Sequence, residues 1–280
     1  MTRPKDLDPS SNPRALLGCE LRHARERKGI SQEALGAPLF VSGSFIGQLE
    51  AGTRRMHLEY AQHFDEVLDT GGFFARNCKA VAKSKYPDHF AEAAEAEAVA
   101  TAIKQYAALL IPGLLQTKAY ATEVFRAYHP TATDDVIDAQ VEVRLERARL
   151  LDDPTTPLLW VIVDEAALRR AVGGGAVMTE ALRHMAGLAR EHRIIMQVLP
   201  FGAGAHAAMA GTLRLMEFTD APPLCFVEGP DMGRLLDDPV TVARHTLMLN
   251  LLQATALPPR ESLALIESVA QDYEYGELHP

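Results

Sequence analysis

The stretch SQEALGAPLFVSGSFIGQLEAG, residues 31–52, constrains the fold of this chain more than any other segment. Ser31 stands where a helix N-cap belongs, and Leu35 lies on the inward side of the short helix that follows. After the turn, Ile46 and Leu49 are three residues apart and therefore share the inward face of a second helix. This spacing predicts two short helices around a tight turn, the layout that places a helix in the major groove of DNA.

The second of these helices carries few long side chains. On a helical wheel Ser44 and Gln48 face outward, with Gly43 and Gly47 beside them. Gln48 has the amide that bonds an adenine edge in a bidentate manner, and Ser44 can bond a base or a phosphate. The glycines would let the backbone approach DNA closely. A helical hairpin packed into any small core explains the same spacing without DNA.

Two arginines follow directly. Arg54 and Arg55 come just after Gly52, where they are placed for phosphate contacts, which position a protein on DNA without reading its sequence. Gln32, at the start of the first helix, adds a side-chain amide to the N–H groups that a helix N-terminus offers to a phosphate.

The charge distribution agrees with a DNA-binding segment near the N-terminus. The whole chain has a net charge of −9, which by itself argues against nucleic acid. Residues 1–86, however, hold 13 Lys and Arg against 10 Asp and Glu, whereas the remainder holds 15 against 27. This asymmetry indicates one segment that meets phosphates and a larger acidic body that does not.

The run SQEAL…VSGSFIGQLEAGTRR resembles the helix-turn-helix of the Cro/CI-like (XRE-type) regulators, whose usual pattern is T-Q-E-x-L-A-x-x-x-G-V-S-x-S-x-[IV]-S-x-[IL]-E-x-G. The chain departs from this pattern at Phe40, which replaces the turn glycine, at Pro38, and at the two glycines of the second helix. These departures predict a strained turn and a soft helix. The matching positions are Ser31, Gln32, Glu33, Leu35, Val41, Ser42, Ser44, Ile46, Leu49, Glu50 and Gly52.

The resemblance, together with the outward positions and the arginines, implies binding to a double-stranded DNA operator. Because glycines stand at two of the outward positions, we expect few direct base contacts, with more of the affinity coming from phosphates, DNA shape and dimer spacing. The predicted DNA-binding residues are Gln32, Ser42, Gly43, Ser44, Phe45, Gly47, Gln48, Thr53, Arg54 and Arg55.

Periodicity and composition divide the rest of the chain into helices and strands. Helices are expected at 14–28, 58–68, 89–110, 114–128, 134–151, 164–170, 178–190, 240–256 and 259–269, and strands at 158–163, 194–199, 213–218 and 224–227. The fold class is therefore mainly α with a smaller α/β part. We expect a five-helix Cro/CI-type helix-turn-helix domain, followed by a larger helical domain that contains a short β-sheet.

The expected domain boundaries follow from these elements. Residues 1–13 form a flexible tail, 14–72 the helix-turn-helix domain, 73–87 a connector, and 88–280 a regulatory or partner-binding α/β domain.

The second domain resembles the C-terminal module of the WhiJ-like or antitoxin-like helix-turn-helix regulators of actinobacteria. The matching segments, in the family's order, are IPGLLQTKAYA, RLERARLLDDP, LLWVIVDEAALRRAVGG, MQVLPFGAGAHAAMAG and FVEGPDMGRLLDDP. The resemblance implies a transcriptional regulator of development or secondary metabolism. It also implies a small partner protein encoded by a neighbouring gene, in a toxin–antitoxin-like arrangement.

One loop of the second domain is a candidate for binding a ligand or a partner. It follows an expected strand and is rich in glycine, as loops that hold phosphates are, but it lacks the spacing of a dinucleotide or P-loop motif. A mobile loop with a structural or solvated histidine is the alternative. The candidate residues are Phe201, Gly202, Gly204, His206 and Met209.

Two groups of acids invite a catalytic interpretation, but capping explains them more simply. Asp164 and Glu165 stand where a helix begins, and Arg169 stands near its end, which suits the helix dipole. Glu228 and Asp231 flank a Gly-Pro turn in the same way. We find no catalytic order of Ser, His and Asp, no metal-ligand spacing and no cofactor motif, so we expect no enzyme, no metal and no cofactor.

The remaining composition indicates a cytoplasmic, nucleoid-associated protein. The polar, Pro-rich N-terminus has no apolar core of a signal peptide, and the apolar run at 158–163 is too short for a membrane span. Cys19, Cys78 and Cys225 are odd in number and scattered, which predicts neither disulfides nor a zinc site.

Three hypotheses remain, in this order. The first is a DNA-binding regulator, expected to be a homodimer, whose second domain dimerises or receives a signal. The second is an antitoxin-like protein that chiefly binds a small partner protein. The third is a repressor that responds to a small molecule bound near the 201–209 loop.

Overall fold

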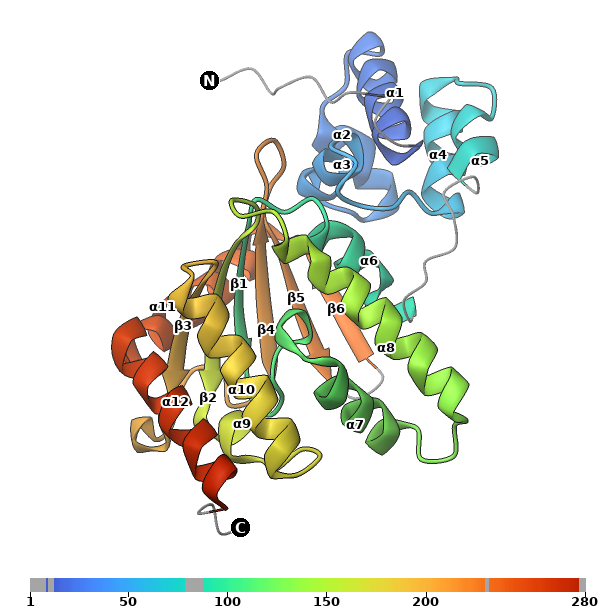
Figure 1. The fold of residues 1–280 in the computed structure, drawn as a ribbon. Coiled ribbons are helices and arrows are strands. Elements are labelled where there is room, and N and C mark those ends of the chain that lie inside the picture. Colours follow the sequence, from blue (N-terminus) through green and yellow to red (C-terminus); the bar gives the residue numbers. More distant parts are fainter. Residues whose placement is uncertain (1–8, 10–12, 79–87, 230–231, 277–280) are drawn as a thin grey trace. The chain divides into compact units, whose positions relative to one another are not determined.

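The computed structural model describes residues 9, 13–78, 88–229 and 232–276 (Figure 1). The chain divides into two compact units. The first comprises residues 1–100, 216–226 and 230–244, and the second comprises residues 101–215, 227–229 and 245–280. Most of the predicted tail at 1–13 and most of the predicted connector at 73–87 lie outside the described residues.

The first unit begins with five helices, the number predicted, although the fifth lies at 73–77, in the stretch predicted as a connector. They are α1 (Pro13–Arg27), α2 (Gln32–Gly36), α3 (Gly43–Glu50), α4 (Leu58–Leu68) and α5 (Phe73–Asn77), with a short 3-10 turn η1 (Ala37–Leu39) after α2. Local chemistry sets their ends: Gly29, with φ +66°, follows α1, and Asp69, with φ +53°, ends α4.

The rest of the first unit comes from two distant parts of the sequence. Helix α6 (Asp88–Glu97) packs against strand β6 (Met232–Leu236), and the ring of Phe90 on α6 meets that of Phe226 edge to face. Phe226 belongs to strand β5 (Leu224–Gly229), and helix α11 (Pro239–Thr255) begins in this unit.

The second unit holds the remaining strands and helices. Its strands are β1 (Ala102–Ala107), β2 (Leu158–Asp164), β3 (Ile194–Leu199) and β4 (Thr212–Glu217), the last of which ends in the first unit. Its helices are α7 (Lys118–Tyr128), α8 (Asp134–Ala148), α9 (Glu165–Arg169), α10 (Gly175–Arg190) and α12 (Pro259–Tyr275), with 3-10 turns η3 (Gly113–Leu115), η4 (Arg149–Leu151) and η5 (Phe201–Ala203).

The six strands form one sheet in the order β3-β2-β1-β4-β5-β6. β1, β2 and β3 are parallel, with Tyr106 opposite Ile162 and Leu159 opposite Ile194. The connections from β4 to β5 and from β5 to β6 are too short for the crossover that parallel strands need, so these pairs are antiparallel. The sheet is therefore mixed, and the fold is mainly α with a smaller α/β part, as predicted.

A polar network holds α12 to the strands beneath it. Helix α12 packs on both β3 and α10. The Gln197 side chain on β3 accepts the Trp160 indole N–H at 2.9 Å and donates to the Leu257 carbonyl at 3.0 Å. The Ser262 hydroxyl on α12 accepts the Val198 N–H at 2.9 Å. Buried polar groups are thus satisfied where helix, strand and loop meet.

Besides α5, the sequence prediction fails in two places. The predicted helix 89–110 is wrong beyond Glu97, because the chain turns there and forms β1, which lies between β2 and β4 in the sheet. Strand β6 is absent from the predicted elements. In both places sheet pairing determines the conformation, and the alanine-rich run before β1 had favoured helix by propensity alone.

Candidate nucleic-acid interface

The N-terminal helices share one hydrophobic core. Leu21, Leu35, Ile46 and Phe64 have no exposed surface, and Leu49 is almost as deeply buried. Leu35, Ile46 and Leu49 were predicted to point inward from helical spacing, and this cluster packs α3 against α1, α2 and α4. The helix that should face DNA therefore stands on a rigid base.

The turn before α3 is strained, as we predict from the presence of Phe40 where the family pattern has a glycine. Phe40 adopts φ +54°, in the left-handed region that a side chain makes unfavourable, and the residue is 98% exposed. A Cβ on Gly36 would lie 2.7 Å from the Val41 carbonyl oxygen, so the chain can pass this close only at a glycine.

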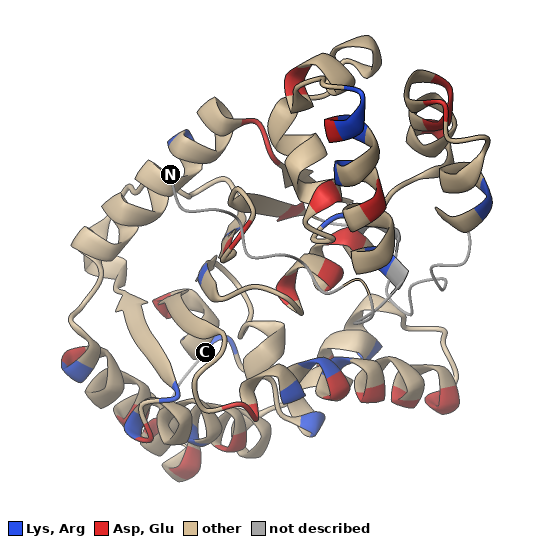
Figure 2. Ribbon diagram, turned by 90° about the horizontal axis from the view of Figure 1, so that it is seen from above, with Lys and Arg blue, Asp and Glu red and all other residues tan. Residues whose placement is uncertain are grey.

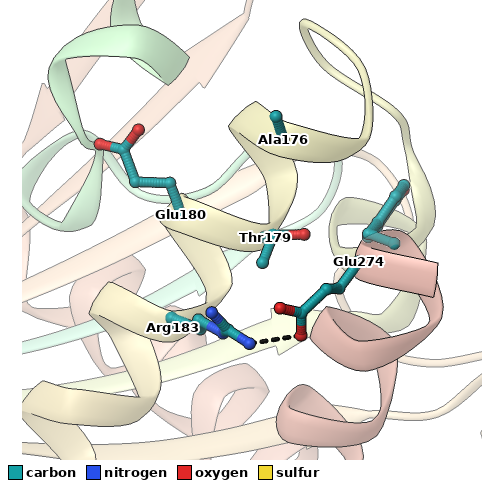
Figure 3. A pocket seen from close by; sticks show the side chains of 6 residues that line it. Ala176, Thr179, Glu180, Arg183 and Glu274 are labelled. Atoms are coloured by element: carbon teal, nitrogen blue, oxygen red, sulfur yellow. Dashed lines mark hydrogen bonds and ion pairs between the residues drawn. The ribbon is translucent and has the colours of Figure 1, made fainter. Parts of the chain in front are cut away.

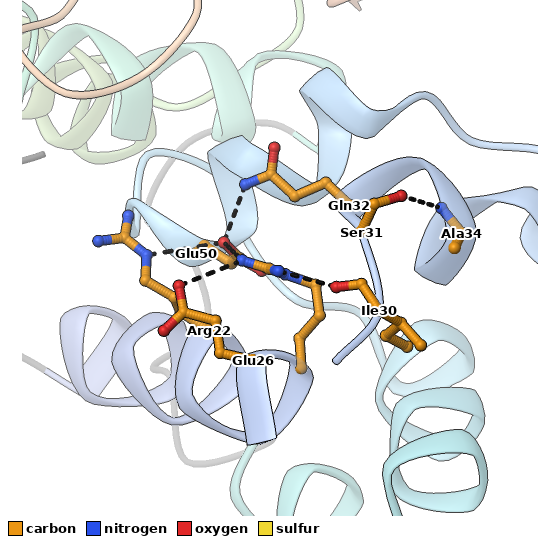
Figure 4. Close-up of polar contacts among 8 residues, drawn as sticks. Arg22, Glu26, Ile30, Ser31, Gln32, Ala34 and Glu50 are labelled. Atoms are coloured by element: carbon orange, nitrogen blue, oxygen red, sulfur yellow. Dashed lines mark hydrogen bonds and ion pairs between the residues drawn. The ribbon is translucent and has the colours of Figure 1, made fainter. Parts of the chain in front are cut away.

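A buried ion pair joins α1 to α3 (Figure 4). The Glu50 carboxylate has no exposed surface and accepts hydrogen bonds from Arg25 Nε at 2.5 Å and Nη2 at 3.1 Å, while Arg22 lies 3.6 Å away. This hydrogen bond raises the pKa of Arg25 above its ordinary value, against the lowering by burial. Arg25 also donates to the Ile30 carbonyl, so one guanidinium holds three segments together.

Gln32 belongs to the same cluster. Its Nε2 donates to Glu50 at 2.9 Å, so its amide supports the ion pair in this structure (Figure 4). Its predicted contact with a phosphate stays a prediction.

The start of α3 has the geometry of an anion-binding helix terminus. Ser42 is the N-cap, and its hydroxyl accepts the Phe45 N–H at 3.0 Å. A Cβ on Gly43 would lie 2.6 Å from the Glu33 carboxylate, and one on Gly47 would lie 3.3 Å from the Gln32 amide. The glycines of α3 therefore leave room for side chains of α2, a packing role that the sequence interpretation missed.

The predicted outward orientation of Gln48 is wrong for this structure. Gln48 has no exposed surface, and neither atom of its side-chain amide has a hydrogen-bond partner among the described residues. The hydroxyl of Ser44 is likewise buried without a described partner, on a residue of intermediate exposure. Their predicted roles at base edges are not tested by this arrangement.

The segment after α3 holds the predicted phosphate contacts. The Thr53 hydroxyl donates to the Gln48 carbonyl at 3.2 Å and closes the helix end. The Arg54 guanidinium stacks over the Phe45 ring at 4.3 Å and lies within 3.5 Å of carboxylates of Glu92 and Asp237. Acidic and basic positions are mixed along the helices generally (Figure 2).

The 201–209 loop of the second unit lies beside a polar cluster. The Tyr106 hydroxyl donates to Asp164 at 2.9 Å and lies 3.4 Å from His206 Nε2, which is 3.8 Å from the same carboxylate. His206 Nδ1 accepts the Ala208 N–H at 3.3 Å, which places the ring hydrogen on Nε2. Burial and the hydrogen bond to Asp164 raise the pKa of Tyr106 above its ordinary value, so the hydroxyl stays protonated.

Sequence reasoning missed the partners of His206, although a signal was present. Tyr106 and Asp164 stand near the carboxyl ends of β1 and β2, and such ends meet at one edge of a parallel sheet. Around them Phe201 and Met209 are 59% and 69% exposed, and Gly202 and Gly204 are exposed too, with Gly204 at φ +64°.

Of the acids interpreted as helix caps, Asp164 and Glu165 lie at a helix start as predicted, whereas Glu228 does not. Asp164 accepts the Ala166 N–H at 2.9 Å and caps α9. Glu165 pairs with Arg169 at 2.7 Å, and its other oxygen accepts the Phe201 N–H at 2.8 Å. Glu228 lies in β5, and Asp231 lies outside the described residues.

A shallow hollow lies between α10 and α12 (Figure 3). Arg183 and Glu274 form an ion pair across it, while Glu180 points away from that pair. The Tyr273 hydroxyl is buried there without a hydrogen-bond partner among the described residues. The hollow is open to solvent, and its charged pair is already neutralised.

Comparison with protein families matches both parts of the chain. The family described as a helix-turn-helix domain matches residues 16–72, and the family described as "Domain of unknown function (DUF5753)" matches residues 90–268. No match was found among curated proteins or among solved structures. In the part of the chain that the structure describes, no helix combines the length and apolar character that crossing a membrane requires.

Proposed function

Because the chain belongs to the DUF5753 family and carries a helix-turn-helix domain, we propose that it is a transcriptional regulator that binds a specific double-stranded DNA operator. The helix-turn-helix match supports DNA binding in general. The Ser42-capped start of α3, held on α1 by the Arg25–Glu50 pair, is the observation that supports this use of the domain. The backbone N–H groups at the start of a helix, together with a capping hydroxyl held in a fixed position, suit a phosphate of the DNA backbone.

The chemistry of the side chains assigns a different role in DNA binding to each group of residues. Arg54 and Arg55 contact phosphates, which supply affinity without sequence information. Gln48 is the side chain with two hydrogen-bonding groups of opposite polarity, as an adenine edge requires. The regulator acts as a homodimer on inverted half-sites, and the DUF5753 domain supplies dimerisation, partner binding or signal reception.

Mapping of the DNA bound by the protein across its genome, followed by binding to the recovered site at several salt concentrations, tests the proposal. Replacing Arg54 and Arg55 with Ala should weaken binding to all sequences alike and reduce the salt slope by about one for each phosphate that the variant no longer neutralises. Gln48→Ala should relax specificity at one base pair, at a cost of about 1–3 kcal/mol. Failure to recover any enriched site would refute the proposal.

A second candidate function is response to a small molecule at the 201–209 loop. The Tyr106, Asp164 and His206 cluster favours it, because ligands of α/β sheets bind at the carboxyl ends of parallel strands. A compound that raises the melting temperature of the wild-type chain but not of His206→Ala would support this function. If no such compound is found, dimerisation or binding of a small partner protein remains the proposed function of the DUF5753 domain.

A further inference from the structure

Two carboxylates lie against the groups that the helix-turn-helix would present to DNA phosphates. Asp237, just after β6, places Oδ2 3.2 Å from Arg54 Nη1 and 3.4 Å from the Ser42 hydroxyl. Glu92, on α6, places Oε2 3.5 Å from Arg54 Nη2 and Oε1 2.6 Å from His57 Nε2. All five residues belong to the first compact unit.

These contacts repeat the chemistry of a phosphate contact. An Arg fork and a helix-capping hydroxyl recognise anionic oxygens, and carboxylates and phosphates both supply them. One turn further along α6, Glu95 lies 3.4 Å from Arg14 of α1. Acidic side chains therefore approach basic groups of the helix-turn-helix at more than one point.

Glu92 is held in its charged form. Burial acts to raise the pKa of Glu92, but the hydrogen bond with His57 and the charges of Arg54, His57 and Arg55 bring it below its ordinary value. The Arg54 side chain is only 13% exposed. A charge pair removed from water in this way competes with DNA more effectively than a pair on the open surface.

The side chains predicted to read bases are buried in the same structure. The Gln48 amide has no exposed surface and no described partner, and the Ser44 hydroxyl is in the same condition. A buried polar group without a hydrogen-bond partner is unfavourable. Base edges and phosphates of DNA offer hydrogen-bond partners to both groups.

We infer that Glu92 and Asp237 form an acidic clamp that occupies the phosphate-binding groups of the helix-turn-helix and must open before the operator binds. Both residues lie within the span matched by the DUF5753 family, so this domain carries the inhibitory groups. The inference rests on the proposed function and adds its regulation: any signal that moves α6 or the segment after β6 frees Arg54 and Ser42.

The test compares two full-length double variants that change the net charge equally. Glu92→Gln with Asp237→Asn removes the clamp. Asp134→Asn with Glu142→Gln removes two exposed carboxylates that pair with Arg126 and Lys118 in the second unit. The clamp variant should bind the recovered operator about tenfold more tightly than the control variant. Equal affinities of the two variants would overturn the clamp while leaving DNA binding intact.

A second readout needs no DNA. Ser44→Cys is introduced into the wild-type, clamp and control backgrounds, and its alkylation is followed by peptide mass spectrometry. The thiol should react about tenfold faster in the clamp background than in the other two. Equal rates would overturn the clamp; faster labelling without binding to any DNA would retain the clamp and overturn the proposed function. Each protein must unfold in one cooperative thermal transition. If the double clamp variant does not, the single variants Glu92→Gln and Asp237→Asn are tested in its place.

Discussion

At the scale of single residues, Glu50 contributes more to the stability of the helix-turn-helix domain than its position in a sequence pattern indicates. Its carboxylate is completely buried and joins Arg25 and Gln32, one from α1 and one from α2. The family pattern placed Glu50 among the matching positions, but the pattern contains nothing about its partners. Burial of a charge is tolerated only because the partners are in place.

Glu50→Gln should therefore destabilise the helix-turn-helix domain by about 3 kcal/mol or more, because Arg25 is left without its counter-charge in a buried position. Denaturant unfolding followed by circular dichroism measures this change. Glu142→Gln is the matched control: its pair with Lys118 is exposed on both sides, and we expect a change within about 0.5 kcal/mol. An equal effect of the two substitutions would contradict the structural role of Glu50.

Cys225 predicts a pH dependence of stability. Burial raises the pKa of this thiol from 9.0 to about 12, so the folded state keeps a proton that the unfolded chain loses above pH 9. Stability from this group should therefore fall as pH rises, by about 1.4 kcal/mol between pH 8 and pH 10. Denaturant unfolding of the wild type and Cys225→Ala at both pH values isolates this effect. The same decrease in both proteins would contradict the prediction.

At the scale of elements, local signals located most helices and strands correctly. Strand β3 and helix α4 have the predicted ends, and β2 differs by one residue, because each is bounded by its own apolar run or cap. The failures are β1 and β6. A run such as Ala98–Ala100 has helix propensity, and only pairing with β2 makes the residues after it a strand.

Close approach of α1 and α3 yields a prediction at this scale. A Cβ on Gly18 of α1 would lie 2.6 Å from the Glu50 carbonyl oxygen and 2.7 Å from that of Leu49. Both contacts are with backbone, which cannot move aside, so Gly18→Ala should destabilise the domain by about 1–3 kcal/mol.

The matched control for this substitution lies in α10. A Cβ on Gly187 would meet nothing within 4 Å, and an alanine inside a helix loses less conformational entropy than glycine. Gly187→Ala should therefore stabilise the chain by roughly 0.5–1 kcal/mol. Thermal melts of the two variants should shift in opposite directions; a shift in the same direction would show that α1 and α3 are not in this close contact.

At the scale of the whole molecule, the proposed homodimer makes the spacing of the operator testable. Recognition helices of a dimer reach two half-sites about one helical turn, or about 10 base pairs, apart. Inserting about 5 base pairs between the half-sites should abolish tight binding, and inserting about 10 should restore part of it. Competition binding with these DNAs measures the effect, and indifference to spacing would favour binding by a single chain.

The sequence by itself determined the helix-turn-helix, its inward-facing residues and the cap at Ser31, because these depend on contacts within a few residues. Only the tertiary structure decided the environment of those helices. Ser42 and Asp237 are 195 positions apart, and no periodicity connects them. The partners of His206 are of the same kind, since Tyr106 and Asp164 come from distant strands that only the folded sheet brings to it.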